Sequence, residues 1–219
     1  MSLEQELTTV QALALAELQS GNLAKTIELL RKSLELTETI HGSDSLETGQ
    51  ALFSLALSRA RQEDGLDEAK SLCFRSLEIR KAKKGDVDVS IALTAEFLAI
   101  LEIRLGDYFS ANQLLRLCLS NALSLVGPVH VNTAKVQFLL GSVLSQLTGK
   151  EEEACDLLTK SLETRLSIFG PESPEAIQSR SALVTILTRI NAVERLEKLD
   201  KHPITDNMMS SIPFQQSMR

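Results

Sequence analysis

The sequence predicts an all-α protein in which about 4.5 helix pairs stack into a right-handed superhelical solenoid. The first observation is composition: only 10 glycines and 5 prolines occur in 219 residues, so few residues interrupt helices. The second is a pattern that recurs every 42 or 43 residues. Four glycines are each followed, thirteen positions later, by a leucine: Gly42 by Leu55, Gly85 by Leu98, Gly127 by Leu140, and Gly170 by Leu183. Repeats of this length bury a shared core by stacking on their neighbours.

The spacing between these markers is helical. In the first unit, Leu23, Ile27, Leu30 and Leu34 follow one another at steps of three and four residues, which is typical of an amphipathic helix. Each unit is therefore predicted to hold two helices. The first helices are expected at residues 3–19, 44–62, 87–105, 129–147 and 172–189. The second helices are expected at 22–40, 66–84, 108–125 and 151–168, with a short last one at 192–201.

Glycines mark the turns between these helices. The turn inside each pair carries Gly21, Gly65, Gly106, Gly149 or, in the last unit, Asn191. The loop between units carries one of the marker glycines, and Pro128 and Pro171 follow two of them. One repeat domain is thus predicted over residues 1–202, with units at about 3–42, 43–85, 86–127 and 128–170 and a capping unit at 171–202. Residues 203–219 break the pattern and are predicted to be disordered.

Bulk properties exclude several classes of function. The net charge of −6 and the pI near 5.2 do not favour nucleic acid or an anionic membrane as a partner. No apolar run is long enough for a membrane span. The three cysteines are odd in number and far apart, which favours reduced thiols and a cytoplasmic location. Cys73 and Cys118 are expected in the core, and Cys155 is expected to be more exposed.

Motifs for chemistry are missing from the sequence. The histidines have no second ligand at metal-binding spacing, and no Cys-x-x-Cys pair occurs. No phosphate-binding loop or nucleophile elbow occurs either. The sequence therefore predicts no cofactor, no metal site and no catalytic activity.

Four segments together resemble a known repeat. They are residues 51–56 (Ala-Leu-Phe-Ser-Leu-Ala), 76–80 (Ser-Leu-Glu-Ile-Arg), 106–111 (Gly-Asp-Tyr-Phe-Ser-Ala) and 127–130 (Gly-Pro-Val-His). They are similar to the tetratricopeptide repeat in its kinesin-light-chain form, and the similarity covers about residues 3–200. It implies a solenoid whose first helices line a concave face that binds protein partners. The asparagines that hold a peptide backbone in many family members are absent here.

The resemblance also implies which residues line the concave face. This predicted stripe consists of Gln11, Leu15, Phe53, Leu57, Arg61, Glu96, Ile100, Arg104, Phe138 and Ser142. We expect a mixed groove that binds an apolar peptide or an amphipathic helix of a partner protein, with Arg61 and Arg104 pairing acidic residues of that partner. The alternative is that Phe53, Leu57 and Ile100 pack between repeats and contact no partner.

These features predict a non-catalytic scaffold or adaptor for protein–protein interaction. The alternative is a regulatory subunit, inhibitory or assembly-promoting, or a fragment of a larger enzyme or gene regulator. The basic cluster of Arg80, Lys81, Lys83 and Lys84 is expected to stay solvated at a helix C-terminus, with a phosphate or acidic-peptide site as the alternative. In the capping unit, the short last helix is expected to cover the apolar face around Leu187. If that face stays uncovered, a homodimer through the capping helices is predicted.

Overall fold

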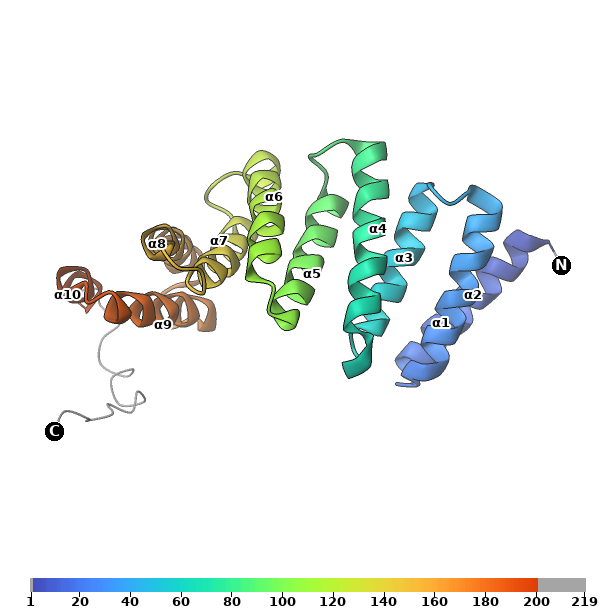
Figure 1. Ribbon diagram of the computed structural model, residues 1–219, viewed down its shortest axis with the longest axis horizontal. Helices are drawn as coiled ribbons and strands as arrows, with labels where there is room; N and C mark the ends of the chain where they lie inside the picture. The colour runs from blue at the N-terminus through green and yellow to red at the C-terminus, as the bar shows by residue number, and fades with distance from the viewer. Residues whose placement is uncertain (1, 201–219) are drawn as a thin grey trace. The chain divides into compact units, whose positions relative to one another are not determined.

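The computed structural model describes residues 2–200, and every regular element in that range is a helix (Figure 1). The chain divides into two compact units, Met1–Leu125 and Val126–Arg219. The helices of the first unit are α1 (Leu3–Gln19), α2 (Leu23–His41), α3 (Leu46–Arg59), the short 3₁₀ helix η1 (Glu63–Gly65), α4 (Leu66–Lys84), α5 (Val89–Leu105) and α6 (Tyr108–Val126). Those of the second unit are α7 (Val131–Leu144), α8 (Glu151–Phe169), α9 (Pro174–Arg189) and α10 (Val193–Asp200).

Helices that follow one another in the chain pack together within each unit. In the first unit α1 to α5 form a continuous series of neighbouring contacts, and in the second unit α7 to α10 do the same (Figure 1). The marker leucines Leu55, Leu98, Leu140 and Leu183 are all buried, as the repeat pattern predicts. The predicted bounds of the second helices agree with the structure to within one residue. The single continuous domain and the disordered tail stay predictions, because the tail lies outside the described residues.

Helix α1 begins where it was predicted, but the other four first helices begin two residues later, because the residues before each start form a capped turn. A side chain at the N-cap accepts a hydrogen bond from a backbone N–H of the first turn, which satisfies a group that has no partner within the helix. This capping side chain belongs to Ser45 in α3, Asp88 in α5, His130 in α7 and Ser173 in α9. The caps recur once per repeat, so each loop between repeats ends in the same way.

Two first helices also end earlier than predicted. The prediction extended α3 to residue 62, but α3 ends at Arg59 and η1 follows it. A Cβ atom on Gly65 would lie 2.0 Å from the carbonyl oxygen of Arg59, so only glycine lets η1 close onto the end of α3. The prediction extended α7 to residue 147, but α7 ends at Leu144. Asn191 adopts a positive φ of 53° and replaces the glycine of the last turn, as predicted.

Gly141 marks the closest approach of α7 and α8, and we expect its replacement by alanine to destabilise the protein. The added Cβ atom would lie 2.8 Å from Cγ of the buried Leu158 and 3.1 Å from the carbonyl oxygen of Ala154. Overpacking should outweigh the better helix propensity of alanine and lower the free energy of unfolding by about 1–2 kcal/mol. Urea denaturation measures this change. Gly49→Ala is the control, because its Cβ atom would meet side chains alone and at longer distances, Ile79 at 3.3 Å and Arg80 at 3.8 Å. Equal effects of the two substitutions would contradict a tight α7–α8 crossing.

Candidate interaction groove

An open groove of about 630 Å³ lies between α1, α2 and α3 in the first unit. Its lining is mostly apolar, and three leucines that border it, Leu15, Leu18 and Leu57, expose 55%, 37% and 41% of their surface. Three residues of the predicted stripe, Gln11, Leu15 and Leu57, lie in this lining. The other lining residues are Leu7, Ala14, Leu18, Thr26, Leu30, Ser33, Thr37, His41, Glu47, Gln50, Ala51, Ser54 and Ser58.

The corresponding space one repeat later is filled by three large side chains. The rings of Phe53 and Phe97 meet edge to face with their centroids 5.7 Å apart, and Cζ of Arg80 lies 5.0 Å from the centroid of Phe53. Each of these residues has an equivalent one repeat earlier. Gln11 is equivalent to Phe53 when Leu13 is aligned with Leu55, and Thr37 is equivalent to Arg80 when Ser33 is aligned with Ser76. Ser54 is equivalent to Phe97 when Leu55 is aligned with Leu98. All three line the groove. The groove is therefore open where smaller side chains occupy these positions, two in the first repeat and one at the start of the second.

Arg80 joins three helices in the filled space. Its Nη1 donates to the carbonyl oxygen of Ser90 (2.9 Å) and to Oγ1 of Thr94 (2.8 Å), both on α5. Its Nη2 donates to Oε1 of Gln50 on α3 (2.8 Å). Arg80 is only 4% exposed, so the prediction that it stays solvated with its basic neighbours is wrong. Burial lowers the pKa of its guanidinium, and the stacking on Phe53 and the three acceptors offset the cost of that burial.

The same arrangement recurs in the second unit. Cζ of Arg165 lies 4.7 Å from the ring centroid of Phe138, and its Nη1 donates to the carbonyl oxygen of Glu175 (2.8 Å) and to Oγ of Ser179 (2.9 Å). Phe138 lies 85 positions after Phe53, and Arg165 lies 85 positions after Arg80. This shared spacing of a phenylalanine and an arginine was the signal in the sequence that would have identified the pair.

The remaining stripe residues lie outside the groove. Nη1 of Arg104 donates to the carbonyl oxygen of Ala60 (2.8 Å), which places its positive charge at the C-terminal end of α3. Arg61 is exposed in the turn after α3, and Glu96 and Ile100 are half-buried on α5. In the second unit, Oγ of Ser142 donates to the carbonyl oxygen of Phe138, at 2.8 Å. Binding of a partner by these residues stays a prediction.

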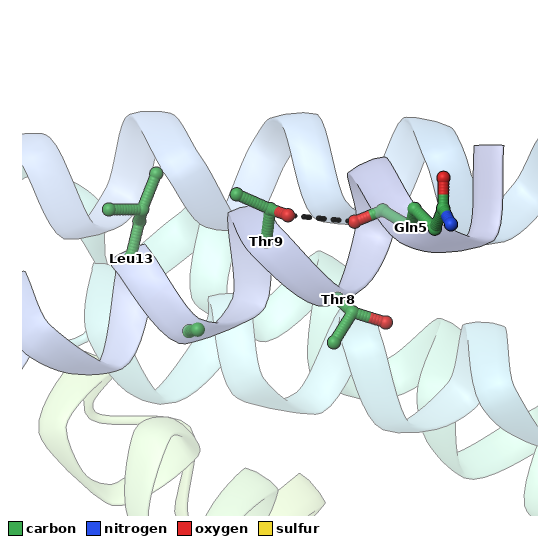
Figure 2. Close-up of a pocket in the computed structure, with 5 residues that line it drawn as sticks. Gln5, Thr8, Thr9 and Leu13 are labelled. Carbon is green, nitrogen blue, oxygen red and sulfur yellow. Dashed lines mark hydrogen bonds between the residues drawn. The ribbon is translucent and has the colours of Figure 1, made fainter. Parts of the chain in front are cut away.

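A second hollow lies on the exposed face of α1 (Figure 2). Gln5, Thr8, Thr9, Ala12 and Leu13 line it, and Oγ1 of Thr9 donates to the carbonyl oxygen of Gln5 at 2.8 Å. Because one helix supplies the whole lining, the hollow has no opposing wall. We therefore assign no site to it.

The cysteines are buried. Burial raises the pKa of the Cys73 thiol to about 12 and also raises the pKa of the Cys155 thiol, which keeps both protonated at neutral pH. The expectation that Cys155 is more exposed is wrong, because it is 0% exposed on the inner face of α8. No cluster of three or more potential metal ligands occurs among residues 2–200. Within the same range, no helix is long and apolar enough to cross a membrane.

Comparisons with known proteins agree with the helical repeat fold. Residues 5–82 match the family model of the tetratricopeptide repeat. No curated protein sequence matches the chain significantly. A solved structure described as a Podosopora anserina putative kinesin light chain with nearly identical TPR-like repeats is 18% identical, with a TM-score of 0.73 over 89% of this chain and 91% of that one.

Two further solved structures share the fold. BtubC (BKLC) from P. vanneervenii is 17% identical, with a TM-score of 0.74 over 99% of this chain and 86% of that one. The MamA protein is 14% identical, with a TM-score of 0.62 over 89% of this chain and 90% of that one. These likenesses confirm the predicted all-α solenoid, and the family model confirms the predicted repeat. Residues 5–82 are therefore tetratricopeptide repeats, and the chain has the TPR-like solenoid fold found in kinesin-light-chain repeat proteins.

Proposed function

We propose that the chain is a non-catalytic adaptor that holds an apolar segment of a partner protein in the groove between α1, α2 and α3. The tetratricopeptide repeat is a scaffold for protein–protein interaction, and residues 5–82, which carry it, include all three of these helices. The observation that carries the proposal is that the chain fills the equivalent space of the next repeat with its own side chains but leaves this one open.

The lining suits an amphipathic helix or an extended peptide with apolar anchors. The exposed leucines of α1 and α3 offer apolar surface to a partner. Each Å² of this surface that the partner removes from water contributes about 25 cal/mol to the free energy of binding. The acidic partner segment, the homodimer, the regulatory alternative and the cytoplasmic location stay predictions. The homodimer would need an uncovered face on α9, whereas Leu183, Ile186 and Leu187 are buried within the second unit.

A peptide selection tests the groove. A random peptide library displayed on phage is selected on the wild-type chain, and the recovered peptides are measured against the double variant Leu15→Asp/Leu57→Asp. An apolar segment that binds this variant would have to cover two carboxylates and remove them from water, which costs free energy. We therefore expect the variant to bind the peptides at least about 30-fold more weakly than the wild type. Fluorescence polarisation with labelled peptides gives the dissociation constants.

The matched control is Leu13→Asp/Leu93→Asp. Both leucines lie in the first unit, about half of the surface of each is exposed, and neither lines the groove. This variant should bind the selected peptides as the wild type does, and circular dichroism should show that both variants keep their helices. If no selected peptide distinguishes the groove variant from the control, the groove is not the binding site.

A further inference from the structure

We propose that two copies of the chain associate through the outer face of α1 and so form a two-fold symmetric homodimer. The outer face is a set of exposed residues that recur at steps of three and four and therefore share one side of the helix. It consists of Gln5, Thr8, Thr9, Ala12, Leu13, Ala16 and Gln19 (Figure 2). The proposal does not rest on the groove, because none of these residues lines it.

Leu13 shows that this face lacks a covering helix. It is 50% exposed, whereas its equivalents in the later repeats, Leu55, Leu98, Leu140 and Leu183, are 3% exposed or less. Helices α1 and α3 both pack on the second helix of their own repeat, but α3 also packs on α2, the second helix of the repeat before it. The position of Leu13 is therefore buried in the other repeats and uncovered in α1.

The outer face carries no charged residue, although 24% of the residues of the chain are charged. The charged residues of α1 are Glu4, Glu6 and Glu17, and all three lie outside this face. Glu6 pairs with Lys32 on α2 (2.6 Å), and Oε2 of Glu17 accepts a hydrogen bond from Nδ2 of Asn22, the N-cap of α2 (2.9 Å). Both carboxylates are thus held toward α2, and the outer face stays uncharged.

Charge favours a second copy of the chain as the occupant of this face. Each copy has a net charge of −6, so two copies repel each other, and this repulsion is smallest where both contact surfaces are uncharged. A charged partner segment would find no opposite charge on the outer face. The same face on a second copy buries no charged group and leaves none without a partner.

The shape of the face also suits a second α1 helix. Ala12 and Ala16 are small, so two copies of α1 can approach closely beside Leu13. The hollow in this face has no opposing wall within one chain, and a second copy supplies that wall. A contact between two identical faces is isologous, so it closes as a dimer and does not propagate into a filament.

Head-to-tail stacking fits this face less well. In such a stack α10 of one copy would cover α1 of the next, as α2 covers α3 within the chain. Five of the eight residues of α10 are charged: Glu194, Arg195, Glu197, Lys198 and Asp200. Covering such a helix with an uncharged face would remove charged groups from water without giving them partners. The symmetric contact between two α1 helices has no such cost.

The length of α1 sets the expected affinity. A helix of 17 residues is about 25 Å long. A pair of such helices buries less surface than the roughly 1,200 Å² at which stable interfaces begin. We therefore expect a weak dimer, with a dissociation constant of about 10–100 µM.

Sedimentation velocity on the full chain tests the proposal. Over a series from about 5 to about 500 µM, the weight-average sedimentation coefficient of the wild type should rise from that of a monomer toward that of a dimer. Leu13→Asp places a carboxylate in the contact and should raise the dissociation constant at least about tenfold. A wild type that stays monomeric throughout the series would overturn the proposal.

The matched control is Leu93→Asp. Leu93 lies on α5 and is 54% exposed, so the substitution adds the same charge at an equally exposed leucine outside the outer face. This variant should dimerise as the wild type does, and circular dichroism should show that both variants keep their helices. If Leu13→Asp dimerises as strongly as Leu93→Asp, the outer face is not the contact and the proposal is wrong.

Cross-linking identifies the surfaces that meet. The three native cysteines are 1% exposed or less, so a short bismaleimide should react with an introduced surface cysteine. Ala12→Cys should give a covalent dimer at concentrations above the dissociation constant. Ala82→Cys, at an exposed position of α4, is the control and should give little. Equal yields of covalent dimer from the two variants would contradict a contact through α1.

The dimer and the groove can fail independently. Leu15→Asp/Leu57→Asp should lose peptide binding and keep dimerisation, because both leucines line the groove and lie outside the outer face. Leu13→Asp should lose dimerisation and keep peptide binding. If the groove variant alone loses dimerisation, two copies meet at the groove, which overturns the proposal.

Discussion

Replacing Arg80 by alanine is expected to lower the free energy of unfolding by about 3 kcal/mol. The substitution removes a buried stem and the stacking on Phe53, and it removes the donor from Oγ1 of Thr94 and from Oε1 of Gln50. Because Arg80 joins α4 to both α3 and α5, the loss should spread over the first unit rather than loosen one helix end. Urea denaturation followed by circular dichroism measures the change.

Two further variants make the result specific. Arg80→Lys keeps the charge but cannot reach the acceptors on both neighbouring helices, so it should recover less than half of the loss. Lys83→Ala, an exposed position on the same helix, should change the free energy of unfolding by less than about 0.5 kcal/mol. If Arg80→Ala has an effect as small as that of Lys83→Ala, the guanidinium does not hold the three helices together.

Replacing Asn121 by alanine is expected to destabilise the first unit by about 2–3 kcal/mol. This side chain is 1% exposed on α6 and connects the helix to the loop before α5. Its Nδ2 donates to the carbonyl oxygens of Asp86 (2.8 Å) and Leu117 (3.1 Å), and its Oδ1 accepts from the backbone N–H of Asp88 (2.9 Å). Alanine removes the side-chain partners of the Asp88 N–H and of the Asp86 carbonyl oxygen, which tie the loop before α5 to α6.

Hydrogen exchange gives a direct readout of this contact. The amide proton of Asp88 should exchange much faster in Asn121→Ala, because its acceptor is gone, while protection inside α4 should change little. Ser120→Ala, at the exposed neighbouring position, is the control and should leave both the stability and the exchange rate unchanged. Unchanged protection of Asp88 in Asn121→Ala would show that Asn121 does not hold the loop.

The repeat and its helices were predictable because their signals are local. Glycine and the step of three or four apolar residues lie within one or two turns of the elements that they define, so α1 and α4 were predicted at their observed bounds. The starts of α3, α5, α7 and α9 were missed by two residues each. There the deciding feature is which loop residue turns its side chain back to cap the helix, and serine, aspartate and histidine share that role.

The concave stripe was predictable only as a set of positions. Gln11, Leu15 and Leu57 border the groove as expected, whereas the accessibility of Phe53 depends on an arginine from the next helix and a phenylalanine from the next repeat. Arg80 was predicted to be solvated, because Lys83 and Lys84 follow it closely and such basic clusters are common at exposed helix ends. No local pattern separates an arginine that points into the core from one that points into solvent.

The sequence by itself determined the repeat, the helices and the core leucines, because these follow from the spacing of residues within a single chain segment. Only the tertiary structure decided which part of the concave face is open. A groove exists where Gln11, Thr37 and Ser54 meet, and it is filled where Phe53, Arg80 and Phe97 meet. In each case the three side chains come from three different helices, which only the packing of the helices brings together. The size of the space between the helices depends on the summed volume of those three side chains.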